Sequence, residues 1–168
     1  MTRGMPARIV SGGQTGIDRA ALDAAARLGL DRGGWCPRGR RAEDGLVPRH
    51  YDLREAPAAD YAGRTRLNVR DSDATLVVIS GGADPGTRLT MRLARAFGRP
   101  LRVIDLDRPP PRSAVRAWLR RHRVGVLNVA GPRESRSPGI YAAALPYLAD
   151  LLGPGKKTQG RDQSNISS

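Results

Sequence analysis

Hydrophobic positions follow two different spacings along this chain of 168 residues. Short aliphatic runs are typical of strands buried on both faces, and the run ATLVVI is the strongest of them. Segments with apolar residues every three or four positions predict amphipathic helices between these runs. The pattern predicts strands at 8–10, 35–36, 74–79, 101–106 and 125–129, and helices at 18–28, 61–70, 87–97, 113–122 and 137–152.

Alternating strands and helices predict βαβ units, and therefore a mostly parallel sheet with helices on both faces. The expected fold is a single three-layer α/β domain of Rossmann-like type over residues 1–152. An irregular segment at 38–57 interrupts the pattern and is expected to lie over a site or a partner. Pro146 is expected to kink the last helix. The polar residues 153–168 have no apolar period, so we expect a disordered tail.

Composition narrows the class of protein. The chain is 39% hydrophobic and 27% charged, as expected for a globular domain. It has neither an apolar run near the ~20 residues that cross a bilayer nor a signal-peptide pattern, so we expect a cytoplasmic protein without a membrane partner. A single cysteine, Cys36, excludes an internal disulfide, and with two histidines it disfavours a zinc site. We expect Cys36 to be buried.

The net charge of +13 suggests an anionic partner. Only Lys156 and Lys157 among the 29 basic residues are lysines, and the arginines are scattered along the chain. Aromatic residues make up 4% of the chain, too few for stacking of single-stranded bases. Nucleic acid is therefore disfavoured as a partner, and a small anionic ligand fits better.

Glycine-rich loops follow three of the predicted strands, at 11–16, 80–87 and 128–135. In a parallel sheet such loops meet at the carboxyl edge, where ligands bind. Glycines let backbone amides approach an anion, helix N-termini add free N–H groups, and Thr15 and Arg133 add side-chain donors. We expect Gln14 to be exposed and to offer its amide to the ligand. The candidate ligand-binding residues are Ser11, Gly12, Gly13, Gln14, Thr15, Gly16, Arg40, Ser80, Gly81, Gly82, Gly86, Thr87, Thr90, Asn128, Gly131, Pro132, Arg133, Glu134 and Ser135.

A catalytic set is not visible in the sequence. There is no Walker A lysine pattern, no strict GxGxxG and no GxSxG nucleophile motif. Asp18, at the start of a predicted helix, is interpreted as an N-cap. We therefore assign no catalytic residue and no metal ligand, and binding is favoured over turnover.

Four segments in the same order carry a family resemblance: IVSGGQTGIDRAALDAA, GGWCPRGRRAEDG, RTRLNVRDSDATLV and LNVAGPRESRSPGIY. They closely resemble the family named "putative molybdenum carrier", a branch of the Rossmann-like, nucleotide-ligand-binding SLOG group. The resemblance spans residues 8–152 and implies a homo-oligomer that binds molybdenum cofactor (molybdopterin). The implied role is storage or transfer of this phosphorylated ligand, with molybdoenzymes or cofactor-synthesis proteins as partners.

The resemblance leaves one alternative, a SLOG-type nucleoside-monophosphate glycosidase or phosphohydrolase. The hydrolases of that group carry a PGGxGTxxE loop, whereas the loop SGGADPGTRLT of this chain lacks the glutamate. If the protein were such an enzyme, Glu43, Glu134 and Arg133 would be its working residues, with a carboxylate activating water beside an arginine-held phosphate.

Overall fold

The computed structural model describes residues 4–155, so the part of the predicted tail at 156–168 lies outside the described residues. Its centre is a five-stranded, wholly parallel sheet in the order β2-β1-β9-β7-β8. The strands are β1 (Arg8–Val10), β2 (Asp31–Gly33), β7 (Ala74–Ile79), β8 (Leu101–Asp105) and β9 (Val126–Ala130).

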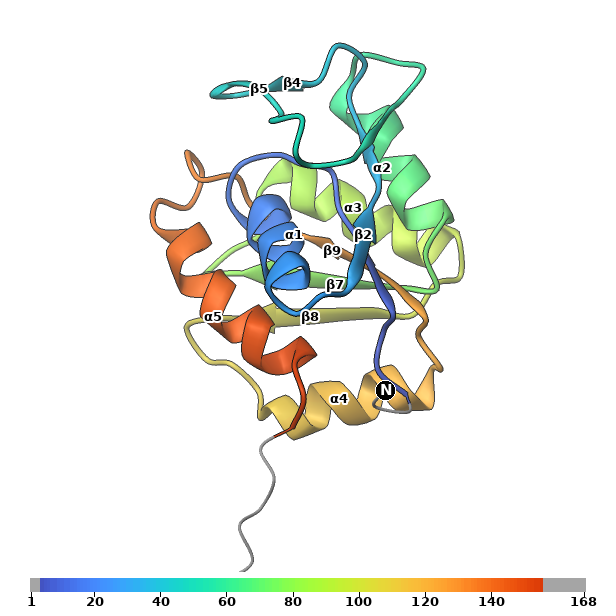
Figure 1. Cartoon of the computed structure of the whole chain (residues 1–168), viewed down its shortest axis with the longest axis vertical. Coiled ribbons are helices and arrows are strands. Elements are labelled where there is room, and N and C mark those ends of the chain that lie inside the picture. Colours follow the sequence, from blue (N-terminus) through green and yellow to red (C-terminus); the bar gives the residue numbers. More distant parts are fainter. Residues whose placement is uncertain (1–3, 156–168) are drawn as a thin grey trace, which may run out of the picture.

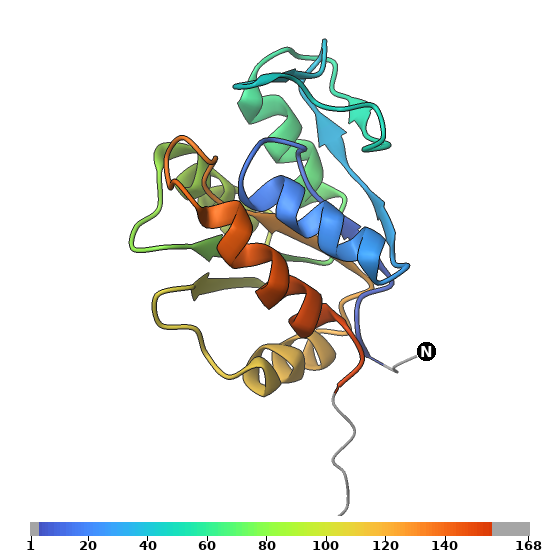
Figure 2. The ribbon, with the colours of Figure 1, turned by 60° about the vertical axis from the view of Figure 1, so that its left-hand side comes forward.

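Helices cover both faces of this sheet, which makes the three-layer Rossmann-like fold that the sequence predicts (Figures 1 and 2). The helices α1, α4 and α5 pack through one apolar cluster, and α2 packs against α3 on the other face. Their bounds are α1 (Ile17–Arg27), α2 (Tyr61–Arg70), α3 (Pro85–Ala96), α4 (Arg112–Arg121) and α5 (Ile140–Leu152).

The two faces of the sheet differ in what they bury. Successive side chains of a strand point to opposite faces, so Leu76 and Val78 of β7 join the apolar core beneath α1, α4 and α5. Thr75 points the other way, and its hydroxyl accepts a hydrogen bond from Asn128 Nδ2 of β9 at 3.2 Å. The face under α2 and α3 is therefore partly polar, and this side of the sheet holds the site described below.

Most predicted elements are confirmed to within a few residues, with two informative exceptions. Strand β2 was not predicted, because the edge strand that starts at the charged residue Asp31 has no aliphatic run. The last helix begins at Ile140 rather than at 137, because Gly139 takes a left-handed conformation (φ 86°) that precedes the helix. Helix α5 then continues through Pro146, which is exposed, to Leu152. No helix among residues 4–155 is long and apolar enough to cross a membrane.

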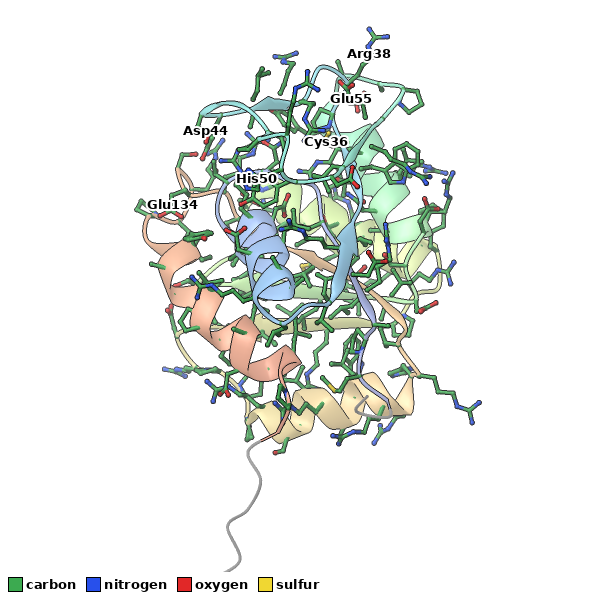
Figure 3. The ribbon with its side chains drawn as sticks, in the orientation of Figure 1. Cys36, Arg38, Asp44, His50, Glu55 and Glu134 are labelled. Carbon is green, nitrogen blue, oxygen red and sulfur yellow. The ribbon has the colours of Figure 1, made fainter. Side chains whose placement is uncertain are left out.

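A small lobe, residues 34–57, projects beyond the sheet above α1 (Figures 1 and 2). It contains two two-stranded sheets, formed by β3 (Trp35–Cys36) with β6 (Arg54–Glu55) and by β4 (Arg41–Ala42) with β5 (Gly45–Leu46). Cys36 is fully buried in its small apolar core, as predicted, together with Val47 and Leu53. Figure 3 shows Cys36 inside this lobe and Arg38 pointing away from it.

Candidate functional site

A cleft of about 240 Å³ lies at the carboxyl edge of the sheet, between the loops that follow β1 and β9 and the N-terminal turns of α2 and α3. Ligands of open α/β sheets bind at this edge. The residues that line the cleft are Gln14, Asp18, Tyr61, Arg64, Thr65, Asp84, Pro85, Gly86, Thr87, Leu89, Thr90, Ala130, Gly131, Arg133 and Arg136. A small polar extension shares four of them and reaches Gly12, Asn68 and Asn128.

Buried polar side chains gather around this cleft. Of the ten buried polar residues in the described chain, five line the cleft and two line its extension. They are Gln14, Asp18, Thr65, Thr87 and Thr90, with Asn68 and Asn128. Burying polar groups costs free energy unless they are hydrogen-bonded, and most of these side chains are hydrogen-bonded within the protein, so the few atoms left without a partner are the informative ones.

An ion pair forms the floor of the cleft. Asp18 Oδ2 lies 3.1 Å from Arg64 Nη1 and accepts a hydrogen bond from the Gln14 backbone amide at 3.2 Å. Burial raises the pKa of Asp18 above its usual range, and the Arg64 guanidinium opposes that rise. Gly12 makes room for the pair, because a Cβ at this position would collide with the guanidinium of Arg64. Asp18 therefore faces the cleft, and the N-cap of α1 is Gly16 instead.

Three polar atoms of cleft residues have no hydrogen-bond partner in residues 4–155: Gln14 Oε1, Arg64 Nε and Thr87 Oγ1. Only two other buried side-chain atoms of the described chain share this condition. An unsatisfied buried polar atom costs about 1–3 kcal/mol. Their concentration in one cleft indicates groups that a ligand would satisfy.

Two further cations line the cleft without a salt bridge to any described residue, Arg133 and Arg136 of the loop after β9. The Arg133 guanidinium stacks over the Tyr61 ring, 4.1 Å from its centroid, which holds the cation at the wall of the cleft. The N-terminus of α3 is partly occupied by the chain itself, since Asp84 accepts a hydrogen bond from the Thr87 amide at 2.7 Å. The arginines are therefore the stronger attraction for an anion.

The structure brings the first and third predicted glycine loops together. Gln14 of the first and both Gly131 and Arg133 of the third line the cleft. Gln14 is only 1% exposed, so the expectation of an exposed amide was wrong. The side chain is held inside by a hydrogen bond from its Nε2 to the Arg41 carbonyl in the lobe, at 2.9 Å.

The second glycine loop contributes only its last part, Gly86, Thr87 and Thr90. Its first part turns to the end of β8, where Ser80 Oγ donates to Asp107 at 2.7 Å and the Gly81 amide donates to Asp105 at 3.2 Å. Ser80, Gly81 and Gly82 lie outside the cleft lining.

Two hydroxyls that the sequence suggested for ligand binding form hydrogen bonds that connect loops of the protein. Thr15 and Ser135 both donate to the Glu43 carboxylate, and the Ser135 amide also donates to it at 3.2 Å. Partial burial raises the pKa of Glu43, but the hydrogen bonds from Ser135 and Thr15 outweigh it and leave the pKa below its usual range. Glu43 thus joins the lobe to the loops after β1 and β9.

The two carboxylates of the enzyme alternative lie outside the cleft lining. Besides the pairing of Glu43, Glu134 accepts hydrogen bonds from the amides of Gly139 at 2.5 Å and Tyr141 at 3.1 Å, so it caps the start of α5. Figure 3 shows Glu134 on the outer side of its loop. Arg133 nevertheless lies close enough to the Glu43 carboxylate to contribute to the lowering of its pKa.

Arg40 lies within the lobe rather than in the cleft. Its guanidinium donates to four backbone carbonyls, at distances from 2.8 to 3.1 Å. The acceptors are Val47, Pro48, Tyr51 and Leu53. Each of its three side-chain nitrogens donates a hydrogen bond, so Arg40 holds together the backbone segments of the lobe.

The comparisons with known proteins agree with this fold. The sequence profile of the circularly permutated YpsA SLOG family matches residues 9–152. The chain belongs to this family. The crystal structure of a protein named "Putative molybdenum carrier protein" from Syntrophus aciditrophicus SB is similar, with a TM-score of 0.83 and 43% sequence identity over 89% of this chain and 96% of that one. None of the curated proteins matches the chain.

In this member of the circularly permutated YpsA SLOG family, sequence reasoning missed one whole side of the cleft. Helix α2 supplies Tyr61, Arg64 and Thr65, and none of them is in a glycine loop. The available signal was the segment from Arg64 to Val77, which carries the family resemblance but was interpreted only as a helix and a strand. Arg136 and Asp84 were also missed.

Proposed function

We propose that this protein binds and carries a phosphorylated heterocyclic small molecule in the cleft, and that molybdenum cofactor is this cargo. One observation carries the proposal. The cleft collects three buried polar atoms without partners and two arginines without a salt bridge among the described residues.

The chemistry of the residues fits the two ends of such a cargo. Arg133 and Arg136 suit a phosphate, because guanidinium groups form strong charge-assisted hydrogen bonds with phosphate oxygens. Gln14 and Asp18 supply an amide and a carboxylate, the kinds of group that bind the nitrogen-rich edge of a pterin. The solved relative from Syntrophus aciditrophicus SB is named a molybdenum carrier, which supports a cargo that contains molybdenum. A carrier of this kind would hand its cargo to enzymes that use the cofactor or receive it from proteins that make it.

The test is binding of purified molybdenum cofactor to the apoprotein under anaerobic conditions, measured by calorimetry and by co-elution in gel filtration. We expect one cofactor per chain. Arg133→Met should weaken binding about tenfold to a hundredfold, the range for loss of one or two charge-assisted hydrogen bonds.

Arg92→Met is the matched control, since Arg92 is exposed on α3 and absent from the cleft lining. It should leave affinity unchanged. Absence of binding by the wild type would refute the proposal, and equal affinity of the two variants would place the site elsewhere.

A further inference from the structure

Near the loop after β1, the cleft contains polar side-chain atoms without a partner, and each can be identified as a hydrogen-bond donor or acceptor. Gln14 is 1% exposed, and its Nε2 donates to the Arg41 carbonyl at 2.9 Å. A carbonyl can only accept, so this bond fixes the orientation of the amide and turns Oε1 away from Arg41. Oε1 has no hydrogen-bond partner in residues 4–155. Gln14 therefore presents an acceptor.

Asp18 presents a second acceptor beside the first. Both of its hydrogen bonds with described residues end on Oδ2, from the Gln14 amide at 3.2 Å and from Arg64 Nη1 at 3.1 Å. Oδ1 accepts neither of these bonds, and the Ser11 hydroxyl beside the carboxylate donates to the Val129 carbonyl at 2.6 Å. The bond between the Gln14 amide and Asp18 keeps the two side chains in one turn of the chain.

Arg64 adds one donor to these two acceptors. Its Nη1 is held by Asp18, whereas its Nε has no partner among the described residues. Apart from the Thr87 hydroxyl, which can both donate and accept, Gln14, Asp18 and Arg64 thus present two acceptors and one donor. This set is the complement of a ring edge that carries two donors and one acceptor.

A 2-amino-4-oxopyrimidine edge has this composition, since it carries an exocyclic amino group, a ring N–H and a carbonyl oxygen. Pterins and guanine share it. Adenine presents an amino donor beside a ring acceptor, which would face one of the protein's acceptors and be repelled. Hypoxanthine lacks the amino group and leaves one acceptor unsatisfied.

We infer that Gln14, Asp18 and Arg64 select ligands by a 2-amino-4-oxopyrimidine edge. The inference rests on the proposed function and deepens it, because it names the class of heterocycle that the cleft accepts. The phosphate is held by Arg133 and Arg136 in every ligand of this kind, so discrimination comes from the ring edge.

The experiment titrates the full chain by calorimetry with GMP, IMP, AMP and neopterin monophosphate. The three nucleotides share ribose and phosphate and differ only in the base. We expect GMP, neopterin monophosphate or both to bind at least tenfold tighter than IMP and AMP, since one unpaired buried group costs about a factor of ten or more. The stronger of the two identifies the source of the edge as guanine or pterin.

The outcomes separate this inference from the proposed function. If IMP or AMP binds as well as GMP and neopterin monophosphate, the cleft is a phosphate site without edge selection and the inference fails while the proposed function stands. If none of the four binds but molybdenum cofactor does, the inference fails as well. If neither these probes nor the cofactor binds, both are refuted.

A substitution of Gln14 tests whether this residue discriminates between ring edges. Gln14→Met keeps the length of the side chain and removes the acceptor, so the ratio of GMP to IMP affinity should fall towards one while IMP affinity is retained. Tyr51→Phe is the control, because Tyr51 is absent from the cleft lining, and it should keep the wild-type ratio. A wild-type ratio in Gln14→Met would exclude Gln14 from the selection. The comparison of ligands on the wild type remains decisive if this variant does not fold.

Discussion

Arg40 offers a direct test of whether an arginine near the cleft serves the ligand or the architecture. Its Nε, Nη1 and Nη2 donate to four carbonyls, at 3.1, 3.0, 2.9 and 2.8 Å. Its backbone has a positive φ of 55°, which is rare for a residue other than glycine. The perturbation is Arg40→Lys, which keeps the charge and removes the planar fork that spans the four acceptors.

The magnitude follows from the number of bonds. Each hydrogen bond from a charged donor contributes about 1.5 kcal/mol net, and a lysine ammonium can keep about two of the four, so the lobe should lose about 3 kcal/mol of local stability. A loss of about 3 kcal/mol raises the population of the opened lobe by roughly a hundredfold. The sheet and its helices do not depend on these bonds, so the global melting temperature should fall only modestly.

Hydrogen exchange measured by mass spectrometry is the assay, on peptides that cover residues 41–55. Exchange there should accelerate by about a hundredfold in Arg40→Lys, while β7 and α5 stay protected. Arg38→Lys is the matched control, because Arg38 is exposed and points away from the lobe (Figure 3). Equal exchange in the two variants, together with weaker ligand binding by Arg40→Lys, would refute this reasoning. Arg40 would then be a ligand-binding residue, as the sequence predicts.

Three further predictions concern single residues of the loops and of α5. Thr15→Val removes a donor to the Glu43 carboxylate and should lower the unfolding free energy by about 1–2 kcal/mol in urea titrations, with ligand affinity unchanged. Burial and Asp23 raise the pKa of Tyr141 to about 12, so the unfolded chain ionises first, and the unfolding free energy should fall as pH rises from about 10 to 12. Gly131→Ala should cost more than about 3 kcal/mol of stability, because its Cβ would collide with a backbone oxygen of β7.

Each of these has an outcome that contradicts it. Weaker ligand binding by Thr15→Val at unchanged stability would mean that the Thr15 hydroxyl binds the ligand rather than stabilising the fold. For Tyr141, the control is Tyr141→Phe, whose stability should depend less on pH in this window; an identical dependence would remove Tyr141 as its cause. A melting temperature of Gly131→Ala equal to that of the wild type would mean that the loop shifts to accept the methyl group.

Much of the architecture follows from the sequence alone. The aliphatic run of β7 and the apolar spacing of α4, which buries Val115 and Leu119, depend on neighbours within a few positions, so the sequence alone predicts which of their residues are buried. The alternation of such elements then implies a parallel sheet, and a parallel sheet implies a ligand edge at its carboxyl ends. The glycine loops predicted the position of the cleft, because the loops that follow parallel strands meet at that edge. The edge strand β2 was missed because charged residues at a sheet edge carry no hydrophobic signal.

The tertiary structure decided which polar residues face the cleft and which face one another. Thr15 and Gln14 are adjacent in the chain, yet one donates to Glu43 of the lobe and the other is buried in the cleft with a free acceptor. Asp18 lies opposite Arg64, which is 46 residues away, and no local pattern pairs them. A hydrogen bond depends on a distance of about 3 Å and on direction, and only the packing of lobe, loops and helices sets both. The sequence indicated the edge of the sheet at which the cleft lies, and the fold determined which of its polar atoms have no partner among the described residues.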